Sequence, residues 1–161
     1  MINKILIIGF GSIGKKYFKI IKKKFQKIKI GIYSKQNISG RYKLRNYSDI
    51  ITYNPDLTIF CNPSSKRLEI LKKIKKTKSH ILFEKPLVDD FKKINRIRVP
   101  NKKIYKVGYN LRQLKILVKL KDLINSKKIG KIYSYHIEAG EFLPNWRKLD
   151  YTKTVSAKKN L

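Results

Sequence analysis

Cysteine is almost missing from this sequence, with Cys61 the single example among 161 residues. A lone cysteine excludes an intrachain disulfide and fits a reducing compartment, so we expect a cytoplasmic location. Long apolar runs are missing too. The first one breaks at Gly9, which is too short for a signal-peptide core, and no segment reaches membrane-spanning length. We therefore expect no membrane partner.

Acidic residues are scarce: 10 Asp and Glu stand against 40 Lys and Arg, a formal net charge of +30. A basic face is how proteins neutralise nucleic-acid phosphates, so nucleic-acid binding is one alternative. The lysines, however, are spread over nearly every predicted helix and loop, and no nucleic-acid-binding module is recognisable. The pattern predicts weak, nonspecific attraction to polyanions and no specific nucleic-acid partner.

The N-terminal stretch contains the most informative motif. An apolar run at 5–8 predicts a strand buried on both faces, and apolar residues at helical spacing predict a helix at 15–25. Between them, Gly9, Gly11 and Gly14 have the spacing G-x-G-x-x-G. These glycines allow a tight turn, close approach of the backbone to a pyrophosphate, and close packing of helix on strand. The motif predicts a dinucleotide site, with a merely structural turn as the alternative.

The second predicted strand, at 28–33, ends where such domains meet the adenosine ribose. An acidic residue at this position favours NAD. This chain has Ser34 and Lys35 instead, a hydroxyl and a cation that suit a 2′-phosphate. We therefore expect NADP as the cofactor, with NAD as the alternative, because Lys35 can stand there by chance in so lysine-rich a chain.

Strand and helix signals alternate along most of the chain, which predicts an α/β fold with a doubly wound parallel sheet. Further strands are predicted at 57–61, 81–83 and 103–107, and helices at 48–53, 66–75, 88–97 and 110–125. The segment 36–46 is predicted to be a loop or a poorly formed helix. After Gly130 the pattern changes, because 131–141 shows the partial period-2 alternation of an antiparallel strand. We expect a dinucleotide-binding domain at 1–126 and the first strand of an incomplete α+β domain at 127–161.

Glu84 and Lys85 follow the predicted strand at 81–83, at the edge where ligands of open α/β sheets bind. A lysine there can donate a hydrogen bond to a substrate hydroxyl and take part in proton transfer, with Glu84 holding it or contacting the nicotinamide ribose. On spacing alone, a strand-ending turn with a surface ion pair fits equally well.

Four motifs now stand in order along the chain: the glycines, Asn62-Pro63, Glu84-Lys85-Pro86, and the segment Val107-Gly108-Tyr109-Asn110-Leu111-Arg112. Together they resemble the N-terminal domain of the Gfo/Idh/MocA family of NAD(P)-dependent oxidoreductases, which includes many sugar and nucleotide-sugar dehydrogenases. The resemblance implies a Rossmann domain that serves hydride transfer between NAD(P) and a hydroxyl-bearing carbon of a sugar or sugar derivative.

The resemblance also assigns residues. Lys85 is the implied catalytic residue, and no metal site is implied. The implied cofactor contacts are Gly9, Phe10, Gly11, Ser12, Ile13, Gly14, Asn62, Pro63, Glu84, Lys85, Asn110, Arg112 and a Trp146-Arg147 pair, in addition to Ser34 and Lys35. For Trp146 and Arg147, a packed aromatic with a surface cation is an equally good interpretation.

Two departures from the family pattern stand out. Arg67 replaces a histidine that the family usually carries after Asn62-Pro63, and the Asp and His that complete the catalytic group with the lysine have no counterpart before Leu161. The only histidines, His80 and His136, have structural contexts. We therefore expect a truncated member that binds the cofactor with little turnover of its own. It would work as a homo-oligomer or with a complementing downstream fragment, and the alternative is a non-catalytic remnant or one half of a split enzyme.

Overall fold

The computed structural model describes residues 1–38, 40–140, 142, 150 and 152. The chain divides into two units, Met1–Tyr109 and Asn110–Leu161. Whether the functional domain boundary falls near residue 126 stays a prediction.

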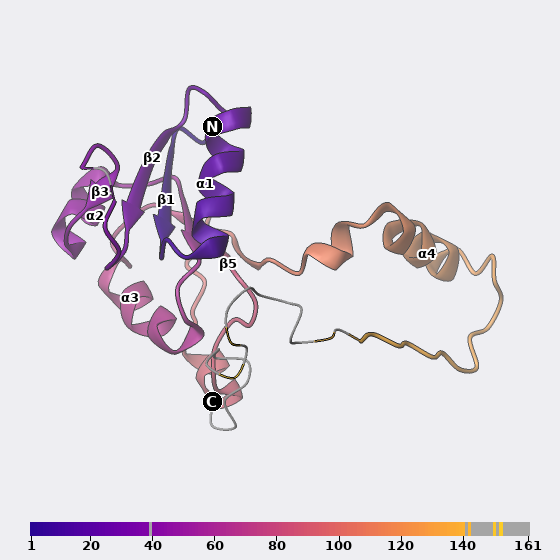
Figure 1. The fold of residues 1–161 in the computed structure, drawn as a ribbon. Helices are drawn as coiled ribbons and strands as arrows, with labels where there is room; N and C mark the ends of the chain where they lie inside the picture. The colour runs from indigo at the N-terminus through magenta and orange to yellow at the C-terminus, as the bar shows by residue number, and fades with distance from the viewer. Residues whose placement is uncertain (39, 141, 143–149, 151, 153–161) are drawn as a thin grey trace. The chain divides into compact units, whose positions relative to one another are not determined.

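The first unit is built on a six-stranded, fully parallel sheet in the order β3-β2-β1-β4-β5-β6 (Figure 1). The strands are β1 (Lys4–Ile8), β2 (Lys29–Tyr33), β3 (Lys43–Leu44), β4 (Leu57–Phe60), β5 (His80–Phe83) and β6 (Tyr105–Val107). The chain winds outward from β1 in one direction and then returns to wind outward in the other. This confirms the expected doubly wound parallel sheet.

Helices cover both faces of the sheet. They are α1 (Ser12–Lys24), α2 (Tyr47–Tyr53) and α3 (Arg67–Lys73), with the 3₁₀ turns η1 (Ser64–Lys66) and η2 (Phe91–Arg96). The side chains of β1 alternate between two core clusters because successive residues of a strand face opposite sides. Ile5 and Ile7 pack with Ile21 of α1, whereas Leu6 and Ile8 lie in the cluster that contains residues of α2 and α3.

Two local features differ from the sequence-based expectation in the first unit. The segment 36–46, predicted to be a loop or a poorly formed helix, contains β3, a two-residue strand that pairs with Ile32 and Tyr33 of β2. So short a strand has no periodicity to detect. The predicted helix at 88–97 is only the 3₁₀ turn η2, in which too few turns form to bury an apolar stripe.

The second unit contains η3 (Asn110–Gln113) and α4 (Lys115–Asn125), where a single helix at 110–125 was predicted. The two are separated by Leu114, whose ψ of 128° is extended. The predicted strand at 131–141 is not observed: residues 131–140 are assigned no strand. The physical reason is that a strand needs a paired neighbour, and none of the described residues pairs with this segment.

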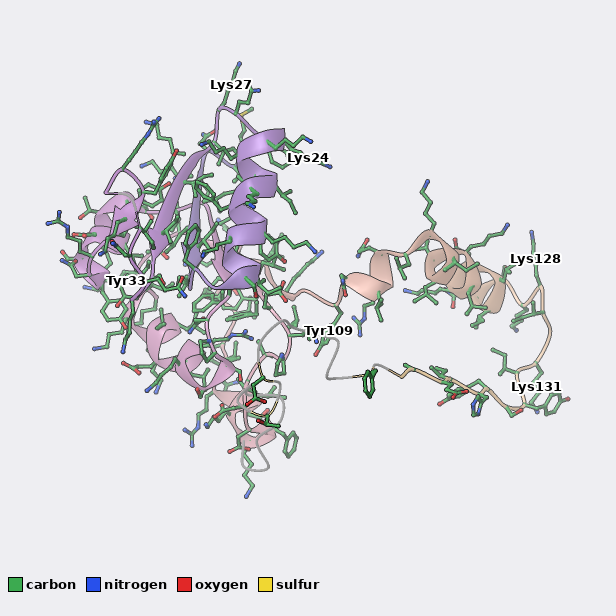
Figure 2. All side chains as sticks on the ribbon, viewed as in Figure 1. Lys24, Lys27, Tyr33, Tyr109, Lys128 and Lys131 are labelled. Carbon is green, nitrogen blue, oxygen red and sulfur yellow. The ribbon has the colours of Figure 1, made fainter. Side chains whose placement is uncertain are left out.

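Exposed lysines occur in both units. Lys24 and Lys27 in the first unit and Lys128 and Lys131 in the second are exposed, and Figure 2 shows them extending away from the backbone. Among the helices that the structure describes, none has both the length and the apolar character needed to cross a membrane.

Candidate functional site

The loops at the carboxyl edge of the sheet are tied to their neighbours by the same kind of hydrogen bond. The amide that begins each loop donates to the last carbonyl of an adjacent strand: Gly9 to Tyr33 (2.8 Å), Cys61 to Ile8 (2.8 Å), Glu84 to Phe60 (3.0 Å) and Gly108 to Phe83 (2.7 Å). The hydrogen bonding between neighbouring strands thus continues one residue past the end of each strand, and these loops all begin at the same edge of the sheet. This is the edge where open α/β sheets bind ligands.

Two of the motif glycines are required by the fold itself. Gly9 has φ of +89°, and a Cβ atom there would lie 2.7 Å from the backbone nitrogen of Asn62. A Cβ at Gly14 would lie 2.1 Å from the carbonyl oxygen of Gly9. Only glycine lets β1 turn this tightly into α1.

Gly11 differs from the other two glycines, because the fold would leave room for a side chain at this position. A Cβ atom at Gly11 would meet nothing within 4 Å, and its φ of −69° is available to any residue. Gly11 is also the N-cap of α1, which has no side-chain cap and no acidic residue in its first turn. Ser12, Ile13 and Gly14 form that first turn, so its backbone N–H groups are left to an outside acceptor such as a phosphate.

A cavity of about 580 Å³ opens beside the glycine turn. The predicted site residues in its wall are Gly9, Phe10, Gly11, Ser34, Lys35, Asn62 and Pro63, and the other lining residues include Tyr33, Gln36, Tyr47, Cys61, Lys66, Glu69 and Ile70. The structure therefore brings the loops after β1, β2 and β4 to one hollow.

The β2 end of this cavity combines an aromatic wall, a hydroxyl and a cation. The rings of Tyr33 and Tyr47 lie 5.3 Å apart, and burial together with hydrogen bonding to Tyr33 raises the pKa of Tyr47 to about 12, so it stays neutral. Ser34 Oγ accepts a 3.2 Å hydrogen bond from the amide of Gln36. The Lys35 side chain is exposed. The two tyrosine rings can stack against a flat nucleotide base, and the ammonium group of Lys35 can then lie beside the ribose of that nucleotide.

The β4 end contains an unpaired polar side chain. Asn62 Oδ1 and Nδ2 are both buried, and neither has a hydrogen-bond partner among the described residues. A buried amide without partners is costly, and few such groups occur in native proteins. Asn62 is also one of the residues that line the cavity, so this unpaired amide lies next to the space that a ligand would occupy.

The neighbouring Cys61 has a different character. Burial, together with the nearby charge of Glu84, raises the pKa of its thiol to about 12. The thiol is therefore neutral at physiological pH and acts as a small apolar side chain.

Glu84 is held in the loop after β5 by Tyr17 of α1. The Tyr17 hydroxyl donates a 2.7 Å hydrogen bond to Glu84 Oε1. Burial, and then the hydrogen bond to Glu84, raise the pKa of Tyr17, so the phenol stays protonated and keeps donating. Lys85 follows in the same loop and is exposed, with no partner in the part of the chain that the structure describes.

The wall of this cavity does not include five other predicted residues of the first unit: Ser12, Ile13, Gly14, Glu84 and Lys85. Asn110 and Arg112 belong to the second unit, in η3. Trp146 and Arg147 lie outside the described residues. His80 is structural, since its Nδ1 accepts a 3.1 Å hydrogen bond from the amide of Ile104. Within the described ranges, no group of three or more His, Cys, Asp or Glu residues could hold a metal ion.

The prediction missed several lining residues, among them Tyr33, Tyr47 and Glu69. Tyr33 was detectable as the last residue of the second predicted strand. Tyr47 and Glu69 come from α2 and α3, and no motif marks them. Tyr17 carried one signal, its place on the buried side of the first helix one turn after Gly14.

The comparisons with known proteins agree with this geometry. A family model described as an oxidoreductase family with an NAD-binding Rossmann fold, GFO_IDH_MocA, matches residues 3–109, which is more than half of the chain. No curated protein matches significantly.

Solved structures share the fold. One is scyllo-inositol dehydrogenase from Lactobacillus casei with bound NAD(H) and scyllo-inositol, with 19% identity over 81% of this chain and 43% of that one, and a TM-score of 0.62. Another is myo-inositol 2-dehydrogenase from Lactobacillus plantarum (21% identity, 82% and 43% covered, TM-score 0.66). A third is an oxidoreductase from Desulfitobacterium hafniense described as NADPH-dependent (21% identity, 81% and 41% covered, TM-score 0.70). The chain spans less than half the length of each of these structures.

Proposed function

Because this chain belongs to the Gfo/Idh/MocA family of oxidoreductases, we propose that its cavity binds NADP and serves hydride transfer with a sugar-type substrate. The observation that carries the proposal is the buried, unpaired amide of Asn62 in the wall of a cavity that begins at the glycine turn. The residues present fit a dinucleotide, since the start of the glycine turn, two tyrosines and Asn62 line one cavity.

Each part of the cofactor has a proposed set of contacts. The turn from Gly9 to Gly14 would hold the pyrophosphate at the N-terminus of α1. Tyr33, Ser34 and Lys35 would surround the adenosine ribose. Asn62, Pro63 and Glu84 would face the nicotinamide half, and Asn110, Arg112, Trp146 and Arg147 remain proposed contacts from the rest of the chain.

The choice of NADP over NAD depends on the end of β2. No acidic residue stands there to accept hydrogen bonds from both ribose hydroxyls, whereas Lys35 is an exposed cation beside the cavity. A 2′-phosphate would gain a charge-assisted contact with this lysine. NAD remains the alternative cofactor.

The bound cofactor supplies the hydride acceptor or donor, and the chain supplies the polar groups around it. Lys85 would donate a hydrogen bond to the substrate hydroxyl and take part in moving its proton. Two of the structural relatives are inositol dehydrogenases by name, so we propose a cyclic polyol or sugar derivative as the substrate class.

We further propose that the 161 residues alone bind the cofactor without substantial turnover. His80 is engaged with the amide of Ile104, and the only other histidine, His136, does not stand in the sequence context of the family's catalytic histidine. The residues that complete the acid–base group would have to come from outside these 161 residues. The alternative is a nucleotide-binding protein without chemistry. Robust oxidation of a panel of sugars with NADP by the isolated chain would contradict this proposal.

Calorimetric titration with NADPH and NADH tests the cofactor proposal. The chain should bind NADPH in the micromolar range, and Lys35→Asp should weaken that binding about tenfold because it replaces an attractive charge with a repulsive one. The matched control is Lys76→Asp, which makes the same change at an exposed lysine away from the cavity and should leave binding unaltered. A folded chain that binds neither nucleotide would refute the proposal.

A further inference from the structure

Arg67, the first residue of α3, is a buried cation in the wall between two functional loops. Only 4% of its surface is exposed. No carboxylate forms an ion pair with it within the described part of the chain, and its hydrogen bonds go to backbone carbonyls. A charge this deeply buried is expensive unless its donors are well satisfied, so this arrangement constrains the groups around it.

The hydrogen bonds of the Arg67 guanidinium fall into two sets. Nε and Nη2 donate to the carbonyl oxygen of Asn62 at 3.2 and 3.0 Å. Nη1 donates to the carbonyls of Glu84 and Pro86, with a longer contact of 3.4 Å to that of Leu87. One side chain therefore connects the loop after β4 with the loop after β5.

These two loops carry the polar groups of the nicotinamide half of the proposed site. The first contains Asn62, whose side-chain amide is buried and unpaired. The second contains Glu84, which Tyr17 holds, and Lys85. By contrast, Ser34 and Lys35 at the adenosine end receive no hydrogen bond from Arg67.

We propose that Arg67 is a positioning residue. By holding the backbone of the two loops, it orients the side-chain amide of Asn62 and the side chain of Lys85 toward the nicotinamide half of the cofactor. The planar fork of the guanidinium makes this possible, because it directs several N–H groups at fixed angles. A lysine would keep the charge and lose the fork. The inference rests on the proposed cofactor function and adds a residue that the family pattern does not supply.

The competing explanation is a purely structural role, in which Arg67 only fastens α3 to the sheet. The two explanations differ in which ligands they affect. A structural role would weaken every ligand of the cavity alike, or none. A positioning role should weaken NADPH, while 2′-phospho-ADP-ribose, which lacks the nicotinamide ring, should bind as before.

The experiment compares both ligands in the full chain and in Arg67→Lys. We expect NADPH affinity to fall about tenfold in the variant, because bidentate charge-assisted bonds that fix the loops are lost, while affinity for 2′-phospho-ADP-ribose stays the same. The fluorescence maximum of the reduced nicotinamide in the complex should also shift. Arg98→Lys is the matched control, since Arg98 is exposed, and should change neither ligand.

The outcomes separate the two proposals. Equal losses for both ligands, or no loss and no shift of nicotinamide emission, would overturn the positioning role while leaving cofactor binding intact. A native chain that binds neither ligand would instead refute the cofactor site itself, and the positioning role with it.

A measurement on the native chain covers the case in which Arg67→Lys does not fold. The Nε–H resonance of Arg67 should move when NADPH is added and stay in place with 2′-phospho-ADP-ribose. A resonance that stays in place with both ligands while NADPH binds would reject the positioning role.

Discussion

The hydroxyl of Tyr17 lies 2.7 Å from Oε1 of Glu84 and donates a hydrogen bond to it, although 67 positions separate the two residues. The bond joins α1, whose N-terminus carries the glycine turn, to the loop after β5. A Cβ atom added at Gly108 would lie 3.3 Å from the same oxygen, so the carboxylate also lies close to the backbone of Gly108. This hydrogen bond thus connects the helix that carries the glycine turn, at the phosphate end of the proposed site, with the loop that carries Glu84, at its nicotinamide end.

Tyr17→Phe should lower both stability and cofactor affinity. The change leaves the Glu84 carboxylate without its donor, which we expect to cost about 1 kcal/mol of unfolding free energy and to weaken NADPH binding several-fold. Urea unfolding and calorimetric titration measure the two effects. Tyr135→Phe, at an exposed tyrosine of the second unit, should alter neither. Unchanged stability and affinity in Tyr17→Phe would show that the bond is dispensable.

Gly9→Ala should destabilise the fold strongly. Alanine would have to adopt φ of +89° and place its Cβ 2.7 Å from the backbone of Asn62, a contact that no flexible side chain can relieve. We expect a loss of about 2–4 kcal/mol in urea unfolding. Gly40→Ala is the control, because a Cβ there meets nothing within 4 Å. Similar unfolding free energies for the two variants would contradict this account.

The parts of the fold that the sequence predicted are those with strong local signals. The run Ile5–Ile8, the three glycines and the alternation of apolar strands with amphipathic helices suffice for a doubly wound sheet, and the structure agrees. β3 escaped detection because two residues cannot show a period, and the break at Leu114 because apolar residues continue through it. The strand predicted at 131–141 is the converse case, an element that was predicted but is not observed. Alternation indicates which residues of a strand would share a face, but it does not show that a neighbouring strand is available to pair with it.

The candidate site divides in a similar way. Glycines and strand-end residues such as Asn62 and Glu84 are readable because parallel topology places strand ends at one edge. The residues that hold these side chains and loops in place cannot be predicted from the sequence. That Tyr17 would reach Glu84, or that Arg67 would bind four carbonyls, depends on packing between segments far apart in sequence. Arg67 was noticed only as a departure from a pattern.

Gly11→Ala should separate ligand binding from folding. Its Cβ meets nothing within 4 Å and its backbone conformation suits alanine, so the expected loss of unfolding free energy is at most about 1 kcal/mol, because alanine is a poorer N-cap than glycine. NADPH binding should weaken at least about tenfold, because the added methyl occupies the space where a pyrophosphate approaches the backbone. A variant that binds NADPH as the native chain does would exclude the glycine turn as the phosphate site.

The last prediction concerns acid stability and Asp56, which directly precedes β4 and binds the backbone at the start of β1. Its carboxylate accepts hydrogen bonds from the amides of Asn3 (2.8 Å) and Lys4 (2.9 Å) and forms an ion pair with Lys78 (3.1 Å). The hydrogen bond from Asn3, followed by that from Lys4 and the charge of Lys78, lowers the pKa of Asp56 from 3.8 to about 2. The ionised carboxylate therefore stabilises the folded state fully above about pH 4, and this contribution disappears as the pH falls through about 2.

Asp56→Asn removes the charge and keeps one acceptor oxygen, so it should lower unfolding free energy by about 1 kcal/mol at neutral pH, a modest value because solvent screens the pair. Between about pH 4 and pH 2 the native chain should lose this advantage, and the two unfolding curves should converge. Asp122→Asn, on α4 of the second unit, should leave the unfolding of the first unit unaltered across the whole range. A gap between native chain and Asp56→Asn that persists undiminished near pH 2 would mean that the stabilisation comes from the acceptor geometry alone and not from the charge.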